Sequence, residues 1–447
     1  MRCFLVAANN RGFTTVLTMA CLGSARLCVR VQEKLCQLGH LSQITRNNST
    51  CVRSKGFPAF ITVNNSQKCQ DNSRVSLPLN NSTVSSVSGC WHPCNRPETA
   101  ATARNYATMR TQQPGPLPVY QVDPYRLLED DLRDLYEDIR LQLRKNTFQK
   151  ELYDVATYYF DGQGKAIRPM IAILMARAIN YHMYKDKSDL LQSQRSVAMI
   201  AEMIHSASLI HDDVIDQSDF RRGKPSVNVL WSHKKVTMAG DFILAVASMM
   251  IARLKNDDVT LILSQVVTDL VQGEFMQLGS KETENERFAH YLTKTYRKTA
   301  SLMANSVKSV ALLSGADAEL ADLAFQYGRN LGLAFQLVDD LLDFVSSSAQ
   351  TGKPTAADLK LGLATAPVLF ACEKFPELNA MIMRRFQEPG DVEKAFEFVH
   401  KSNGLEQTQY LAKQHCQEAA RIASIIAESA FQKALIVTTD LVLNRMK

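Results

Sequence analysis

Two long stretches of this chain, residues 170–222 and residues 288–314, contain neither glycine nor proline. Their apolar residues recur at helical spacing, and strand-like alternation bounded by turns is nearly absent. The C-terminal stretch from Gln407 onward is again rich in Ala, Ile and Leu at helical spacing. We therefore expect an all-α fold, a helical domain larger than a simple four-helix bundle.

The first part of the chain has a different composition. Residues 1–110 carry 13 Lys and Arg against 3 acidic residues, whereas the remainder carries 38 against 42. Residues 1–115 are also rich in Ser, Thr and Asn, without a sustained helical or strand period. This is typical of a mitochondrial transit peptide followed by a disordered linker. We expect the folded domain to span residues 116–447, with Asp123 capping a first helix that begins at Pro124.

A secretory origin is the alternative for this N-terminal segment. A short apolar run at residues 13–22 resembles a signal peptide, and Asn64 and Asn81 would then be glycosylation acceptors. Eight of the ten cysteines lie before residue 95, which leaves only Cys372 and Cys416 in the later chain. So few cysteines are typical of a reducing compartment, which favours the mitochondrial matrix.

Composition and charge exclude several classes of protein. With 46% hydrophobic and 21% charged residues, the chain is ordinary for a globular protein. No apolar run approaches the roughly 20 residues of a membrane-spanning helix, and the uncharged stretch at residues 242–252 predicts a buried helix. Because acids outnumber bases after residue 110, a basic surface for nucleic acid is not expected in the folded part.

The central chemical signal is a pair of aspartate-rich segments, which we call the aspartate ladders. They share one internal spacing and consist of Asp212, Asp213 and Asp216 in the first and Asp339, Asp340 and Asp343 in the second. In a helix the first and last aspartates of each ladder share a face. The simplest alternative is that these aspartates form a solvent-exposed acidic face without a function, but both ladders follow strongly apolar helical segments. Two such ladders suit hard divalent cations, and Mg²⁺ in particular bridges carboxylates to substrate phosphates.

Cationic and polar residues elsewhere fit a diphosphate. Lys165 and Arg168 follow a glycine-rich turn and offer charge-assisted hydrogen bonds, although surface helices often carry such pairs. His205 lies two helical turns before the first ladder, on its face. The remaining candidates lie beside the ladders or in a third helix, and they are Arg221, Arg222, Lys298, Thr299 and Gln336.

Together these motifs resemble the trans-isoprenyl diphosphate synthases, and among them the long-chain mitochondrial branch that makes the ubiquinone side chain. The likeness runs from about Gln121 to the C-terminus. It rests on five ordered motifs: residues 164–169, residues 205–216, residues 221–225, Lys298 with Thr299, and residues 336–343.

The resemblance implies a helical bundle of the isoprenoid synthase type around a deep apolar cavity, with the ladders at its mouth. Asp212, Asp216 and Asp339 would hold Mg²⁺, assisted by Asp213, Asp340 and Asp343. Lys165, Arg168, His205 and Arg222 would bind isopentenyl diphosphate. Arg221, Lys298, Thr299 and Gln336 would bind an allylic diphosphate such as farnesyl or geranylgeranyl diphosphate.

The implied reaction is successive head-to-tail condensation. The allylic carbon–oxygen bond ionises, the isopentenyl double bond attacks, and a proton is lost, with Asp212, Asp216, Lys298 and Asp339 as catalytic residues. The small Ala207 and Ser208, just upstream of the first ladder, would control chain length. A hetero-oligomer with a second, divergent subunit is implied, as is peripheral membrane association when the apolar product is released.

One position departs from the family pattern. Relatives often carry a lysine after the second ladder, in a Gly-Lys pair, where this chain has Leu363. Lys353 or Lys360 is the expected substitute.

Four other functions can be compared with these motifs. A geranylgeranyl-type synthase would make a shorter product from the same motifs. A terpene cyclase would not need the second diphosphate site, and a non-catalytic partner subunit would be expected to lack a ladder or the Lys165–Arg168 pair. An apolar helical scaffold would not need paired carboxylates. We therefore expect a prenyltransferase.

Overall fold

The computed structural model describes residues 120–446 except 163, 186–187, 280–285 and 346–355. All described residues belong to one compact unit, which lies within Arg96–Lys447. The segment predicted as transit peptide and linker, residues 1–115, lies outside the described residues. Its boundary with the folded domain stays a prediction.

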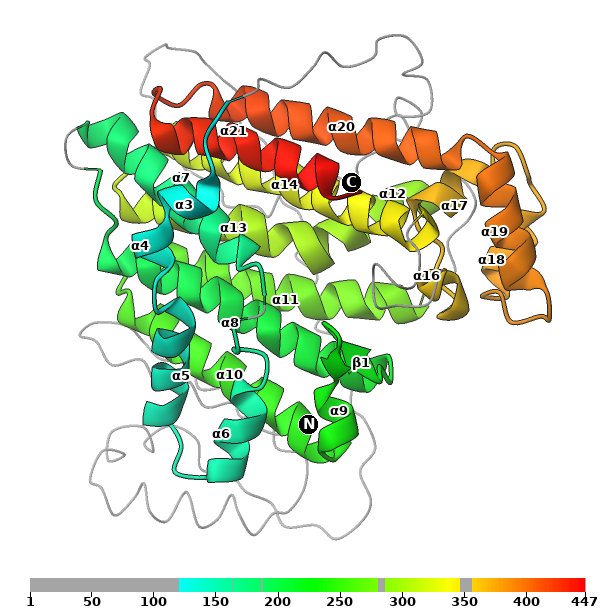
Figure 1. Ribbon diagram of the computed structural model, residues 1–447, viewed down its shortest axis with the longest axis horizontal. Coiled ribbons are helices and arrows are strands. Elements are labelled where there is room, and N and C mark those ends of the chain that lie inside the picture. Colours follow the sequence, from blue (N-terminus) through cyan, green and yellow to red (C-terminus); the bar gives the residue numbers. More distant parts are fainter. Residues whose placement is uncertain (1–119, 163, 186–187, 280–285, 346–355, 447) are drawn as a thin grey trace, which may run out of the picture. The chain divides into compact units, whose positions relative to one another are not determined.

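The described residues are almost entirely helical, which confirms the expected all-α fold (Figure 1). The helices of eight or more residues are α5 (Leu135–Lys145), α6 (Lys150–Thr157), α7 (Ile167–Tyr184), α8 (Gln192–Ile215), α10 (His233–Arg253), α11 (Asp257–Gly279), α12 (Arg287–Thr295), α13 (Ser301–Leu313), α14 (Ala318–Val345), α19 (Asp391–Lys401), α20 (Gly404–Ala423) and α21 (Ala430–Leu443). The shorter elements are α3 (Pro124–Leu127), α4 (Glu129–Leu132), β1 (Phe220–Arg221), β2 (Lys224–Pro225), α9 (Val227–Leu230), the π-helical η1 (Tyr296–Ala300), α16 (Ala357–Lys360), α17 (Ala366–Ala371), α18 (Leu378–Met383) and the 3₁₀ helix η2 (Asn444–Met446).

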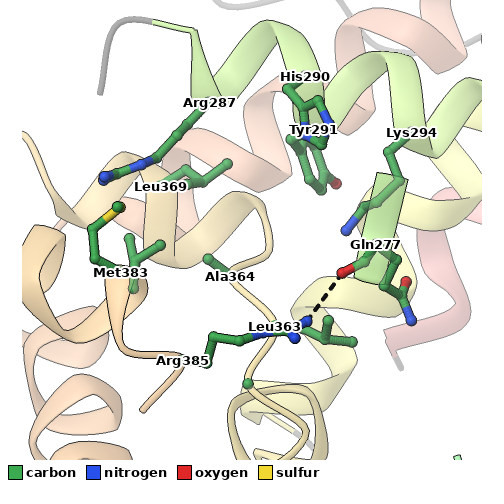
Figure 2. A pocket seen from close by; sticks show the side chains of 12 residues that line it. Gln277, Arg287, His290, Tyr291, Lys294, Leu363, Ala364, Leu369, Met383 and Arg385 are labelled. Carbon is green, nitrogen blue, oxygen red and sulfur yellow. Dashed lines mark hydrogen bonds between the residues drawn. The ribbon is translucent and has the colours of Figure 1, made fainter. Parts of the chain in front are cut away.

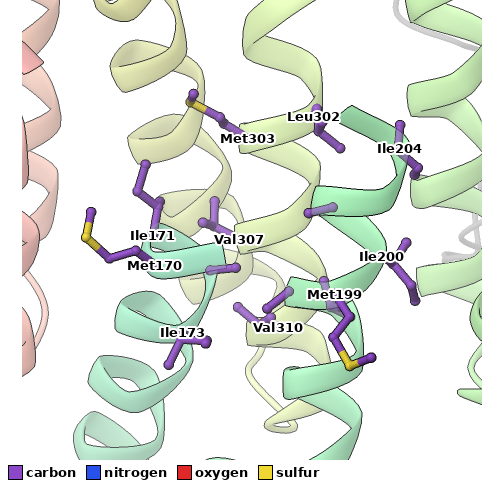
Figure 3. Close-up of a cluster of buried hydrophobic side chains, with 14 of the residues drawn as sticks. Met170, Ile171, Ile173, Met199, Ile200, Ile204, Leu302, Met303, Val307 and Val310 are labelled. Atoms are coloured by element: carbon purple, nitrogen blue, oxygen red, sulfur yellow. The ribbon is translucent and has the colours of Figure 1, made fainter. Parts of the chain in front are cut away.

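The main apolar core lies where the long helices cross. Helix α14 packs against α13 and α20, α8 packs against α10, and α13 also contacts α7 and α8. Figure 3 shows this core where Met170 and Ile173 of α7, Ile200 of α8 and Val307 of α13 meet. Burial of these side chains fixes the helices that carry the candidate site residues.

Helix α10 includes the uncharged stretch that the sequence predicts as a buried helix. It is also the one helix of the described residues that is long and apolar enough to cross a membrane. Yet 44% of its most apolar window is buried inside the structure, where it packs against α6 and α8. Packing within the bundle therefore accounts for the buried part of this helix, while Met238 and Met249 stay exposed.

The beginning of the folded domain follows the predicted capping pattern. The Oδ1 atom of Asp123 accepts hydrogen bonds from the backbone N–H groups of Tyr125 and Arg126, at 2.9 and 3.3 Å, and Pro124 opens α3. The helical spacing that follows is divided among α3, α4 and α5 rather than one helix. The chain breaks at Asp134, whose φ of 59° lies in the left-handed region.

A short hairpin follows the first ladder. Strands β1 and β2 pair antiparallel, with Arg221 opposite Lys224, and residues Arg222 and Gly223 form the turn. Both turn residues have positive φ, 53° and 75°, as a tight two-residue hairpin turn requires. Of the two adjacent arginines, Arg221 therefore lies on a strand and Arg222 lies in the turn.

Helices α12 and α13 are joined without a break by the π-helical segment η1. Widened turns of this kind are rare and frequent at functional sites. Here η1 contains Lys298 and Thr299 and packs against α14. Gly332 of α14 allows this contact, because a Cβ atom there would lie 2.5 Å from the Cα atom of Ala300.

We predict that Gly332→Ala destabilises the protein by about 1–3 kcal/mol, the usual cost of overpacking a tight contact. The free energy of unfolding in urea measures this effect. Asp322→Ala on the exposed side of α14 is the control and should stay within about 0.5 kcal/mol of wild type. Equal stability of Gly332→Ala and wild type would show that α14 and η1 do not need this close approach.

Candidate active site

A cavity of about 690 Å³ lies among the ends of several helices. Its wall combines the segment before α7, the C-terminal half of α8, the hairpin, and α12 with η1. The C-terminal part of α14, α16 and Arg445 of η2 complete it. Seven lysine or arginine side chains and seven carboxylates line this cavity, an unusual concentration of charge within an apolar bundle.

The cavity brings together nearly all of the site residues predicted from the sequence. Those that line it are Lys165, Arg168, His205, Ser208, Asp212, Asp216, Arg221, Arg222, Lys298, Thr299, Gln336, Asp339, Asp340 and Asp343. The two that do not line it are Asp213 and Ala207. Both are fully buried, at 0% exposure.

The first ladder lies at the C-terminal end of α8. Asp212 belongs to the last turn, and Asp216 follows as the C-cap, with its N–H donating to the Asp212 carbonyl at 2.8 Å. Burial raises the pKa of Asp212 to about 7, and the nearby Glu274 and Asp216 act in the same direction. Lys298 opposes that shift. Negative charge is therefore disfavoured at Asp212 in this ligand-free structure.

Asp213 is turned away from the cavity. Its Oδ1 atom accepts a hydrogen bond from Arg221 Nε at 2.6 Å, and its Oδ2 atom accepts one from the Tyr159 hydroxyl. Both oxygens are thus engaged in the protein interior, and Asp213 holds Arg221 and the hairpin in place. It does not line the cavity, and its role as a metal ligand stays a prediction.

In the second ladder the middle aspartate is held in the same way. Asp340 accepts hydrogen bonds from the Tyr291 hydroxyl at 2.5 Å and from Gln336 Nε2 at 2.9 Å. Burial raises its pKa to about 6, against the effect of these hydrogen bonds and of Lys294. Asp340 thus lines the cavity wall but is committed to neighbouring side chains.

The outer aspartates of the second ladder have other partners. Asp339 Oδ1 pairs with Arg445 Nη2 at 3.0 Å. The carboxylate of Asp343 accepts the backbone N–H groups of Ala357 and Asp358 at 3.0 and 3.1 Å, which fixes the start of α16. The structure thus gives the three aspartates of this ladder different roles.

A group of cations occupies another part of the cavity wall. Burial lowers the pKa of His205 well below its usual value, and the charges of Arg168, Arg222 and Arg221 lower it further. His205 is therefore neutral among three arginines. Glu202 lies near Arg168 and accepts a hydrogen bond from the Tyr136 hydroxyl at 3.1 Å.

Two buried arginine nitrogens in this wall are unsatisfied. Arg168 Nε and Arg445 Nη1 have no hydrogen-bond partner among the described residues. Both guanidinium groups also lie near the Phe335 ring, at 5.8 and 4.0 Å from its centroid. Unpaired buried donors are costly, so this wall is suited to an anionic ligand.

The η1 segment contributes a third group. Lys298 Nζ forms an ion pair with Glu274 Oε1 at 2.5 Å and donates to Gln277 Oε1 at 3.0 Å. The Thr299 hydroxyl donates to Gln336 Oε1 at 2.8 Å. Because Gln336 also donates to Asp340, η1 and the second ladder are joined by a chain of hydrogen bonds.

Sequence analysis missed several residues of the cavity wall, among them Glu202, Lys294, Asp358 and Arg445. Glu202 has a local signal, since it is an acid within the apolar run from Ile200 to Ile204. The other three are brought to the cavity by tertiary packing. No local spacing relates them to either ladder.

The position that departs from the family pattern also lies in this wall. Leu363 lines the cavity, whereas Lys360 at the end of α16 is exposed and does not. The placement of Lys360 thus does not support its expected role as substitute. Lys353 lies outside the described residues.

The carboxylates alone do not form a closed metal site. Among the residues that the structure describes, no three His, Cys, Asp or Glu side chains come together closely enough to hold one ion. The available donors are oxygens, which suit hard cations such as Mg²⁺. The donor chemistry therefore fits such an ion, provided that further oxygens come from a ligand.

A helical bundle in which one cavity combines two aspartate ladders with a separate group of cations is suited to an enzyme that acts on diphosphate-bearing substrates. The chain belongs to the polyprenyl synthetase family, whose model matches residues 149–399. Members of this family are prenyltransferases, and the chain is one of them.

Three curated relatives extend the likeness. The all trans-polyprenyl-diphosphate synthase PDSS1 of Homo sapiens is 57% identical over 325 residues, covering 73% of this chain and 78% of its own length. A probable hexaprenyl pyrophosphate synthase, named as mitochondrial, from Yarrowia lipolytica is 39% identical, covering 73% and 85%. The decaprenyl-diphosphate synthase subunit 1 of Schizosaccharomyces pombe is 41% identical, covering 72% and 91%.

A solved structure agrees with the fold. The polyprenyl synthase from Caulobacter crescentus, crystallised with calcium and isoprenyl diphosphate, matches with a TM-score of 0.65 and 27% identity. The match covers 74% of this chain and all of that one. The expected isoprenoid-synthase bundle is therefore confirmed.

We predict that Asp212 makes stability depend on pH. Its raised pKa means that, at a pH above the ordinary aspartate pKa near 3.8, the folded protein still holds a proton that the unfolded chain has lost. Without divalent cations, wild type should therefore lose stability relative to Asp212→Asn as the pH rises from about 4 to about 7. Melting temperatures in chelator measure the difference, and parallel profiles for the two proteins would contradict the assignment.

Proposed function

We propose that this prenyltransferase is the catalytic subunit of a mitochondrial long-chain all-trans-polyprenyl diphosphate synthase. It would add isopentenyl diphosphate repeatedly to an allylic diphosphate such as farnesyl diphosphate, giving the deca- or nonaprenyl precursor of the ubiquinone side chain. The observation that supports this most directly is the joining of both ladders and the Arg168–His205 cation group in one cavity. A catalytic subunit needs all three.

Asp212, Asp216 and Asp339 are the proposed ligands of Mg²⁺, because they line the cavity and present carboxylate oxygens. Since these side chains do not form a closed site, the diphosphate oxygens of the substrate would complete the coordination. When bound, the metal neutralises the charge that develops on the departing diphosphate. In this structure Asp339 Oδ1 is paired with Arg445 Nη2 at 3.0 Å.

Isopentenyl diphosphate is assigned to Lys165, Arg168, His205 and Arg222. Arg168 supports this assignment most strongly, since its buried Nε lacks a partner and would bind a phosphate oxygen. The neutral His205 can donate from its ring N–H without adding another charge to the arginine group. Lys165 contributes a point charge at the cavity wall.

The allylic diphosphate is assigned to Lys298, Arg221, Thr299 and Gln336, with Lys298 and Arg221 as cations. The carbon–oxygen bond of the allylic substrate breaks and its electron pair leaves with the diphosphate, which Lys298 stabilises. The isopentenyl double bond then forms the new carbon–carbon bond, and a proton leaves the product. The paired oxygens of Thr299 and Gln336 would steady the positive carbon, and the released diphosphate is the proposed proton acceptor.

The test of this function is incorporation of labelled isopentenyl diphosphate into farnesyl diphosphate with Mg²⁺, followed by analysis of product length. We predict that Asp339→Ala lowers turnover by about 10²–10³-fold, as for loss of one electrostatic stabiliser elsewhere. Asp322→Ala, an exposed aspartate on the same helix, is the control. Full turnover in Asp339→Ala with unchanged Mg²⁺ dependence would remove the second ladder from the mechanism.

A hetero-oligomer with a second, divergent subunit is proposed from two observations. The relative from Schizosaccharomyces pombe is named as a subunit 1. Helix α11 also exposes large apolar side chains, Leu261 at 67% and Phe275 at 73%, together with Val271 and Leu278. An apolar stripe of this kind marks an interaction surface. We propose that the second subunit covers α11, which also contributes Gln277 to the cavity.

The proposed location is the mitochondrial matrix. The composition of residues 1–115 supports a transit peptide, and the relative from Yarrowia lipolytica is named as mitochondrial. Release of a long apolar product would take place at a membrane surface. Import of a fusion of residues 1–115 to a reporter protein tests the targeting role.

Chain length is proposed to depend on the face of α8 that precedes the first ladder. Ser208 lines the cavity, and its hydroxyl donates to the His205 carbonyl at 2.8 Å. Ala207 lies on the neighbouring face, fully buried in the main apolar core. A growing tail would therefore pass Ser208 first and would reach Ala207 only by displacing core side chains.

We predict that Ser208→Phe shortens the product by several isoprene units while the first condensation still occurs, because the ring obstructs the inner cavity. Mass analysis of the products measures this. Ala207→Phe tests the deeper path: shorter products would show that the tail reaches the core around Ala207. A folded, active Ser208→Phe enzyme that makes full-length product would show that the tail leaves by another route.

A further inference from the structure

Lys294 of α12 is a cation that the assignments above do not use. It lies one helical turn before Lys298 and lines the main cavity. It also lines a smaller adjoining pocket of about 70 Å³, together with Gln277, Tyr291 and Leu363. Figure 2 shows its side chain extending from α12 toward Gln277 and Leu363, so its amino group lies at the border of the two spaces.

Lys294 lies over the Tyr291 ring, with Nζ 5.7 Å from its centroid, but it forms no ion pair with a described carboxylate. Burial lowers the pKa of its amino group, and Lys298 lowers it further, while Asp340, Asp358 and Glu274 act in the opposite direction. Among the described residues, none of these carboxylates lies within ion-pair distance of Nζ. A half-buried ammonium group without a counter-ion is unfavourable. An anion beside Lys294 would supply the counter-charge that this ammonium group lacks.

The opposite wall of the same border is apolar. Leu363 stands where the family resemblance leads us to expect a lysine, and it lines both spaces that Lys294 lines. Lys360 is exposed and belongs to neither lining. Arg385 lines the smaller pocket but not the main cavity, and its Nη2 donates to the Gln277 carbonyl at 3.0 Å. Of these cations near position 363, Lys294 is therefore the one that lines both spaces.

We propose that Lys294 binds the diphosphate of the allylic substrate and takes over the role of the absent lysine at position 363. This inference rests on the proposed function, and it adds a substrate-binding residue contributed by a different helix. The assignment to the allylic diphosphate follows from the surroundings. Lys294 lies near Lys298 and Asp340, whereas Arg168 and His205 lie near Arg222 and near each other.

The decisive variant is Lys294→Met, which keeps an unbranched apolar stem and removes the charge. In the full chain with its partner subunit, we predict that the KM for farnesyl diphosphate rises roughly 10- to 100-fold, as for loss of one charge-assisted hydrogen bond. The KM for isopentenyl diphosphate should stay unchanged. Lys165→Met should show the opposite pattern, because Lys165 is assigned to the other substrate.

Two further variants separate a binding role from a structural one. Lys360→Met is the matched control and should leave both constants unchanged. Leu363→Lys, introduced into Lys294→Met, should restore a low KM for farnesyl diphosphate. If the role of Lys294 were only structural, this second substitution would not restore the KM. An unchanged allylic KM in Lys294→Met, or the loss appearing in Lys360→Met instead, would overturn the proposal.

A binding measurement distinguishes failure of this inference from failure of the proposed function. Titration calorimetry with inorganic diphosphate and Mg²⁺ needs no turnover. If wild type lacks prenyl transfer but Lys294→Met still loses diphosphate affinity, the function is wrong and the binding role stands. If wild type transfers prenyl groups and Lys294→Met binds diphosphate as tightly as wild type, only the role of Lys294 is wrong.

Discussion

Both aspartate ladders lie at the C-terminal ends of long helices, α8 and α14, and the rest of the cavity is organised around this fact. The C-terminal end is the negative pole of a helix, so carboxylates there are repelled by the backbone as well as by one another. Arg221, Lys298 and Arg445 approach these ends from three other elements. Such an unfavourable arrangement of charges is expected in a site that binds both cations and anions.

The middle aspartates of the two ladders are held by the same arrangement of hydrogen bonds. In each, a tyrosine hydroxyl donates to the middle aspartate, Tyr159 to Asp213 and Tyr291 to Asp340. A second donor then engages the other oxygen, Arg221 in one case and Gln336 in the other. The middle aspartates are thereby fixed inside the protein. This leaves the first aspartates, Asp212 and Asp339, at the cavity wall.

Much of this site was predictable because local spacing fixes which residues share a helical face. The ladder spacing predicted that Asp212 and Asp216 share a face, and both line one cavity with the second ladder. It could not predict that Asp213 turns inward, because its partner Tyr159 is distant in sequence. Lys294 and Arg445 depend on packing between separate helices. The all-α fold followed from the uninterrupted helical stretches, whereas the π-helical turn in η1 has no comparable signal.

That π-helical turn has a consequence for insertions and deletions. A π turn contains one residue more than an α turn, so α12 and α13 are out of register with a single continuous α-helix. Deleting one codon within residues 296–300 would convert the π turn into an α turn, and the flanking helices would keep nearly the same faces toward α14. Deleting one codon in the regular part of α12 after Lys294 would instead rotate Tyr291 and Lys294 by about 100° relative to α14.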